Sequence, residues 1–195
     1  MNPSRLLDGL RLANRGVATV VGVMLAVTAA FIIADITMRQ FGHSLGGSDE
    51  ISGYAMAITA SWGLGYALLE RAHVRIDILH RRLPGGGRAA LDLIAIAALA
   101  ATVALVAFQC WPVLEKSLSR GSRANTPLET PLWIPQALWF GGWVWFAGCA
   151  LAMLGAAVTL LAGRRREPFD TWFAATDEVS EVMAEAVGED GSVER

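Results

Sequence analysis

The most prominent pattern along the chain is an alternation of long apolar segments with shorter polar and charged ones. The apolar segments cover about residues 17–34, 51–69, 93–113 and 134–162. An α-helix needs about 20 mostly apolar residues to cross a hydrocarbon core of roughly 30 Å. Each segment reaches or nearly reaches this length, so the pattern predicts an all-α membrane protein with four transmembrane helices.

The same pattern divides the chain into two regions. Residues 1–163 form the predicted transmembrane domain, and residues 164–195 form an acidic tail whose apolar positions suit a short amphipathic helix. The first apolar segment follows three arginines, as the core of a secretory signal does. It is longer than the usual signal core of about 7 to 15 residues, and no convincing cleavage site follows it. We therefore expect it to remain as the first span.

The positive charges predict the orientation of the spans, because short cytoplasmic loops carry an excess of lysine and arginine. Eleven such side chains lie before the first span, between the second and third, and just after the fourth. The other two loops hold four. Both termini are therefore expected in the cytoplasm. The first and third loops would face outward, into the periplasm if the membrane is the inner membrane of a Gram-negative bacterium.

The loop between the second and third spans, residues 71–84, has a pattern of its own. Ile76, Leu79 and Leu83 fall on one helical face, with arginines around the rest. This predicts a short amphipathic helix in the inner interface, its arginines toward lipid phosphates; a solvated positive loop is the alternative. Pro84 and the three glycines after it are expected to break this helix and allow the turn into the third span.

An ionisable pair, Asp35 and Arg39, ends the first span. A charge at membrane depth suggests a function. The two residues are four apart with the acid first, which is the favoured order for an ion pair on one helix. Either they neutralise each other at the helix end, or they contact a partner protein.

The second span opens with Ser48, Asp49 and Glu50. Serine before two acids is typical of a helix N-terminus, where the hydroxyl accepts from free backbone N–H groups and the carboxylates favour the positive end of the dipole. Capping by Ser48 is therefore the simplest interpretation.

The outer ends of the third and fourth spans are marked by proline and tryptophan. Gln109 and Pro112 are expected to end the third span, and a polar loop follows over residues 115–130. Trp139 and Trp143 share one face of the fourth span with Phe146. An aromatic belt at the headgroups explains them, and a groove for a partner protein is the alternative.

The chain lacks the side-chain patterns of catalysis and of cofactor binding. All three histidines lie in loops, so the facing pairs that hold haem inside a helical bundle are missing. Cys110 and Cys149 lack ligand spacing and are expected to be small buried residues. No catalytic residue, cofactor, metal site or nucleic-acid surface is predicted. Such a chain is expected to support another membrane protein and not to be an enzyme.

Three stretches of the chain resemble one known family. An acidic pair opens the second span (residues 48–54, SDEISGY), an arginine-histidine stretch follows it (residues 71–77, RAHVRID), and a proline-tryptophan stretch opens the fourth span (residues 130–135, TPLWIP). On a four-span frame, their order resembles the small membrane subunit of the tripartite ATP-independent periplasmic (TRAP) transporters. The family usually has a tryptophan just before the acidic pair, where this chain has Gly47.

The resemblance implies a partnership of three components. A periplasmic solute-binding protein would deliver a small carboxylate solute to a large many-span subunit that moves it with sodium by an elevator-like mechanism. The small subunit would scaffold the stationary part of the large one. Asp49 and Glu50 would then meet the large subunit or the binding protein outside. An inner-edge anchor in contact with lipid or partner would comprise Arg71, His73, Arg75 and Asp77.

Two other interpretations of the sequence remain open. One is a stand-alone four-helix membrane enzyme or redox protein, which an absorbance scan for a bound cofactor would reveal. The other is an unrelated membrane assembly or regulatory protein, which would co-purify with a partner other than a many-span subunit.

Overall fold

The computed structural model describes residues 3–70 and 85–163, which form four long helices. They are α1 (Pro3–Gln40), α2 (Ser48–Leu69), α4 (Gly85–Arg120) and α5 (Trp133–Ala162). Among the described residues the only extended pairing is an isolated antiparallel bridge between Arg123 and Pro131. The predicted all-α fold is thus confirmed over this part of the chain.

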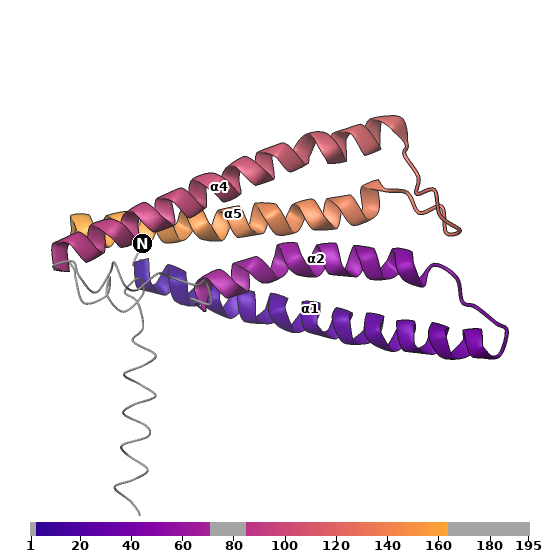
Figure 1. Cartoon of the computed structure of the whole chain (residues 1–195). Helices are drawn as coiled ribbons and strands as arrows, with labels where there is room; N and C mark the ends of the chain where they lie inside the picture. Colours follow the sequence, from indigo (N-terminus) through magenta and orange to yellow (C-terminus); the bar gives the residue numbers. More distant parts are fainter. Residues whose placement is uncertain (1–2, 71–84, 164–195) are drawn as a thin grey trace, which may run out of the picture.

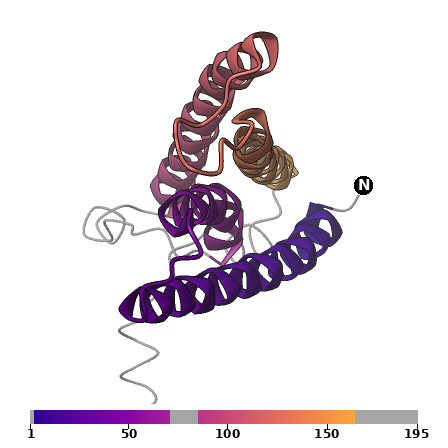
Figure 2. The same ribbon diagram turned by 90° about the vertical axis from the view of Figure 1, so that its right-hand side faces the viewer.

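The helices lie side by side in the order α4, α5, α2, α1; α1 and α4 run in one direction, and α2 and α5 run in the other (Figure 1). α2 and α5 form the middle of this row, and α1 and α4 flank it. α1 runs obliquely across its neighbours when the row is seen from the end (Figure 2). The loops after α1 and after α4 lie together at one end of the helices. The first and last described residues lie at the opposite end.

Three of the helices are long and apolar enough to cross a membrane, over Arg5–Gln40, Gly87–Arg120 and Trp133–Ala162. The fourth, α2, is shorter, at 22 residues, and begins with two acids. Its serines, glycines and tyrosines further lower its apolar content. Polar and small residues are tolerated in α2 because it lies between α1 and α5, where other helices cover it.

The helices extend past the predicted spans, and two predicted breaks are wrong. The glycines at 85–87 form the first turn of α4 and do not lie in a turn before it. α4 also continues through Pro112 to Arg120, so the loop between α4 and α5 starts at Gly121. A proline removes one helical hydrogen bond, a loss that a helix of 36 residues packed along α5 can absorb.

The proline-rich approach to the fourth span is also partly helical. Pro127 and Pro131 lie in the loop, and Pro135 lies in the first turn of α5. Proline is tolerated there because the N–H groups of the first turn have no helical acceptor.

The apolar core forms around the C-terminal half of α5. Phe146, Ala150, Met153 and Ala157 of this helix are almost completely buried, and they pack in one cluster with Ala100 of α4. Small side chains let helix backbones approach closely, which is how helices associate in lipid. The alanine-rich third span therefore packs as a small-residue helix along this face.

α2 packs tightly against α5 at Gly142. A Cβ atom at this position would lie 2.7 Å from Cβ of Ser61 and 2.8 Å from Cδ1 of Trp62. Nearby, the indole Nε1 of Trp62 donates to the Leu138 carbonyl at 2.9 Å. Glycine at 142 therefore sets the distance between the two central helices.

Candidate functional site

The loop end of α1 is organised by a fully buried carboxylate, Asp35. Its Oδ2 accepts from Nε of Arg39 at 2.8 Å and from the hydroxyl of Ser48 at 2.7 Å. Its Oδ1 accepts from the backbone N–H of Leu45 at 2.8 Å and from the hydroxyl of Ser44 at 3.1 Å. One carboxylate thus holds the end of α1, the connecting loop and the start of α2.

The Asp35–Arg39 ion pair is confirmed, with Nη2 of Arg39 2.7 Å from Oδ2 of Asp35. The predicted capping role of Ser48 is wrong. The residue before α2 is Gly47, and no side chain caps the helix. The hydroxyl of Ser48 instead donates to Asp35 and accepts from Nη2 of Arg39 at 3.0 Å. A hydrogen bond to a charged acceptor is stronger than one between neutral groups, so the hydroxyl turns toward the buried carboxylate.

Glu50 links α2 to the loop between α4 and α5. Its carboxylate accepts from the hydroxyl of Tyr54 at 2.7 Å and from the hydroxyl of Thr126. Gly47 lies under the same loop, with φ at +71°, and a Cβ there would lie 2.6 Å from Cγ of Leu128. A tryptophan at 47 would not fit this backbone. Asp49, by contrast, is exposed.

At the opposite end of the helices, the carboxylate of Glu70 pairs with two arginines of α1. Nε of Arg11 donates to Oε1 of Glu70 at 2.9 Å, and Nη2 of Arg11 pairs with Oε2. Nε of Arg15 lies 3.4 Å from Oε1. The hydrogen bond from Arg11 is the main reason that the pKa of Glu70 falls from 4.5 to about 2. This clamp was not predicted, although two arginines four apart facing one acid at the end of the next span is its sequence signal.

A buried asparagine joins α1 to α5 further along. Oδ1 of Asn14 accepts from Nε1 of Trp145 at 3.0 Å, and its Nδ2 donates to the Leu10 carbonyl at 2.9 Å and to Sγ of Cys149 at 3.4 Å. Cys110 and Cys149 are buried free thiols, as expected. Asn14 was missed, although its spacing from Leu7 and Leu10 places it on the inward face of α1.

The tryptophans of α5 divide between the core and the surface. Trp143 packs against the core cluster, its ring centroid 6.2 Å from that of Phe146. Its buried Nε1 has no hydrogen-bond partner among the described residues. Trp139 is partly exposed, and Trp133 at the start of the helix is exposed.

Over residues 3–70 and 85–163, no group of three or more histidine, cysteine or acidic residues lies close enough to hold a metal ion. What the described residues show is a set of side-chain hydrogen bonds at both ends of an apolar four-helix frame; we call these hydrogen bonds the polar ties.

One family model matches the chain, over residues 28–166, and its description is tripartite ATP-independent periplasmic transporters, DctQ component. Comparisons with curated proteins and with solved structures found no match. The matched stretch covers well over half of the 195 residues. The chain belongs to the DctQ family.

A DctQ protein is the small membrane component of a TRAP transporter, so the resemblance predicted from the sequence is confirmed. Together with the membrane-crossing helices, this makes the chain a multi-pass membrane protein of a transport system. The DctQ match places the chain with transporter components and not with the other two interpretations.

The DctQ match includes the Asp35 and Glu50 ties, but Arg11 and Asn14 lie before its first residue. The predicted inner-edge anchor, Arg71, His73, Arg75 and Asp77, is inside the match. It lies outside the described residues, as do the segments 71–84 and 164–195, for which the sequence predicts an interfacial helix and a helix in the tail.

Proposed function

We propose that this DctQ protein is the stationary scaffold of a large many-span subunit in the bacterial inner membrane. The complex would take up a small carboxylate solute with sodium, from a periplasmic binding protein, by an elevator-like movement of the large subunit. Family membership supports the general role, and the form of the four-helix frame supports the scaffold.

The observation that supports the scaffold role is a contrast within the protein. Side-chain hydrogen bonds connect the helix ends, whereas the apolar side of α1 is left exposed. Asp35, Glu50 and Glu70 hold α1, α2 and the loop between α4 and α5 together by side-chain hydrogen bonds. Yet only 6% of the most apolar stretch of α1 is buried, against 44% for α5. A frame fixed at its ends with an unpartnered apolar helix suits packing beside a larger membrane protein.

We also propose that α2 is a fourth span. Its 22 residues rise about 33 Å, which is enough to cross the hydrocarbon core. α1 and α4 run in the same direction, so the chain must return between them, and α2 is the described element that does so (Figure 1). Both termini would then lie on one side, and the excess of arginine assigns that side to the cytoplasm.

The predicted contact residues take different parts in this proposal. Arg39, Asp49 and Trp139 have exposed or partly exposed side chains and are assigned to partner contacts. Asp35, Glu50 and Trp143 make their contacts inside the chain and are assigned to holding the frame. From the sequence alone, Arg71, His73, Arg75 and Asp77 remain assigned to the inner-edge anchor in contact with lipid or partner.

The first test is a mild-detergent purification of tagged protein from its native membrane, read by mass spectrometry. A stoichiometric many-span membrane protein is expected. Its absence, after gentler extraction and crosslinking, would contradict the scaffold role.

Photocrosslinking would then locate the contact. A photoreactive residue at Val23, which is 58% exposed on α1, should capture the many-span subunit. The same residue at Val103 of α4, which is 3% exposed, is the control and should react only within the chain. Capture from Leu105 on the outer face of α4, and not from Val23, would assign the contact to the opposite flank.

A further inference from the structure

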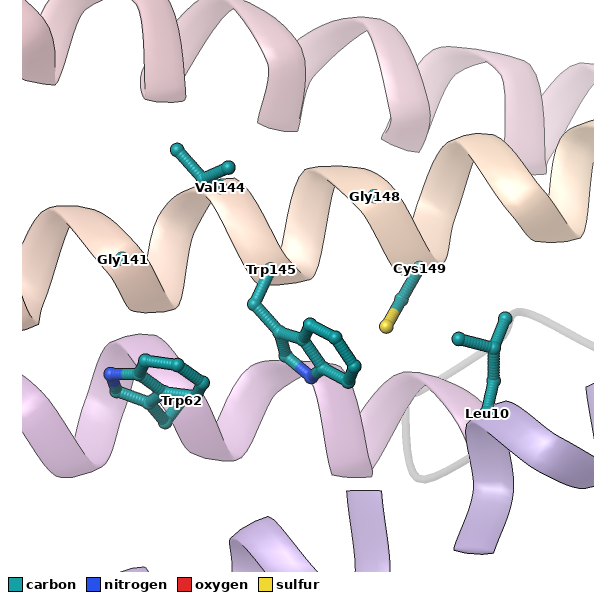
Figure 3. Close-up of a pocket in the computed structure, with 7 residues that line it drawn as sticks. All are labelled: Leu10, Trp62, Gly141, Val144, Trp145, Gly148 and Cys149. Atoms are coloured by element: carbon teal, nitrogen blue, oxygen red, sulfur yellow. The ribbon is translucent and has the colours of Figure 1, made fainter. Parts of the chain in front are cut away.

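An apolar groove of about 390 Å³ opens between α5, α2 and α1 (Figure 3). Gly141, Val144 and Gly148 line it from α5, Trp62 from α2 and Leu10 from α1. Its volume is within the range of small-molecule sites in proteins, roughly 300–1,000 Å³. None of the ties described above uses this space.

The polar atoms beside the groove already have partners within the chain. Nε1 of Trp62 donates to the Leu138 carbonyl, and Nε1 of Trp145 donates to Asn14. Sγ of Cys149 accepts from the same asparagine. An occupant therefore meets apolar surface and needs no hydrogen-bonding group of its own.

The groove also lies at the depth of lipid hydrocarbon. Gly148 is at the middle of α5, a helix long and apolar enough to cross the membrane over Trp133–Ala162. Water is excluded at this depth, so the occupant is either a lipid chain or part of a membrane protein.

The width of the groove decides between these two. Gly141 and Cys149 are eight residues apart, so the groove extends for about 12 Å along α5 at about 1.5 Å per residue. Even the whole empty space in the groove, about 670 Å³, spread over this length has a mean cross-section of about 56 Å². A helix about 10–12 Å across needs roughly 80–110 Å². The groove accepts an extended hydrocarbon chain and not a helix.

We propose that this groove binds one acyl chain of a membrane phospholipid. The glycines at 141 and 148 leave the floor open, and the two indoles and Leu10 form its walls. The bound chain would fill the space between α1 and α5 that the helices themselves leave open.

The test compares two glycines on the same helix. Gly148 lines the groove and Gly155 does not, and a Cβ at either position has no atom within 4 Å. The full-length protein, purified from its membrane with its partners, would be examined by native mass spectrometry. Wild type and Gly155→Leu are expected to retain one phospholipid per chain. Gly148→Leu is expected to lose at least nine-tenths of that occupancy. Equal retention in both variants, or none in wild type, would overturn the proposal.

A second measurement leaves Gly148 in place and identifies the occupant. A photoreactive residue at Val144 in the groove would be irradiated after a delipidating detergent wash, with Val158 as a control of equal exposure outside it. A phospholipid adduct at Val144 but not at Val158 is expected. A protein or detergent adduct at Val144, or equal lipid labelling at both sites, would refute acyl-chain binding. These outcomes do not depend on which many-span subunit co-purifies.

Discussion

The hydroxyl of Ser48, the first residue of α2, donates to the carboxylate of Asp35 on α1 at 2.7 Å. Both side chains are buried, at 5% and 0% exposure. The bond crosses the loop between two antiparallel helices, so it sets where α2 begins relative to the end of α1. A hydrogen bond to a buried charged group is stronger than one between neutral groups.

Ser48→Ala is expected to reduce the free energy of unfolding by about 1–3 kcal/mol, because it removes a hydrogen bond to a charged acceptor. Ser52→Ala is the matched control, since its hydroxyl donates only to the Asp49 carbonyl within the same turn. Unfolding in detergent with increasing denaturant measures both. Equal stability of the two variants would show that Asp35 does not depend on Ser48.

Glu50→Gln is expected to loosen the loop between α4 and α5 (residues 121–132), because Thr126 then loses a charged acceptor. Hydrogen exchange of the loop amides should become faster in this variant. Asp49→Asn changes an exposed neighbour of the same charge and should leave loop exchange as in wild type. Unchanged exchange in Glu50→Gln would show that this carboxylate does not hold the loop, which would leave it for contact with a partner protein.

The Glu70 clamp predicts a dependence of stability on pH. The folded pKa of Glu70, about 2, is below its ordinary value of 4.5, so ionised Glu70 stabilises the folded state. This contribution is complete above pH 4.5 and is lost as the pH falls toward 2. The stability difference between wild type and Glu70→Gln, measured by thermal unfolding across this window, should be largest at neutral pH and shrink in acid. A difference that stays constant with pH would contradict the clamp.

Gly142→Ala is expected to destabilise the protein by about 1–3 kcal/mol, since its Cβ would be forced against Ser61 and Trp62. Gly155→Ala, on the same helix with open space around it, should be neutral or stabilising by up to about 1 kcal/mol. Thermal unfolding of the two variants side by side measures the contrast. If both behave alike, α2 and α5 do not approach at Gly142 as described.

A protein of this kind reveals its helices in its sequence, because lipid requires every backbone polar group to be satisfied within its own helix. The long apolar runs therefore predicted the helical class, and Asp35 and Arg39 predicted their own ion pair from a spacing of four residues. The three short motifs predicted the family. Each of these features depends on residues that are close together in the chain.

Only the tertiary structure decided which polar groups meet across the helices. Ser48 had a plausible local role as a helix cap, yet its hydroxyl donates to Asp35 on the preceding helix. Glu70 and Arg11 are 59 residues apart, and Asn14 and Trp145 are 131 apart, so no local spacing connects them. The sequence alone determined which segments form long apolar helices, because the hydrophobicity of each segment depends on its own composition. The contacts that tie the segments together depend on how the helices pack.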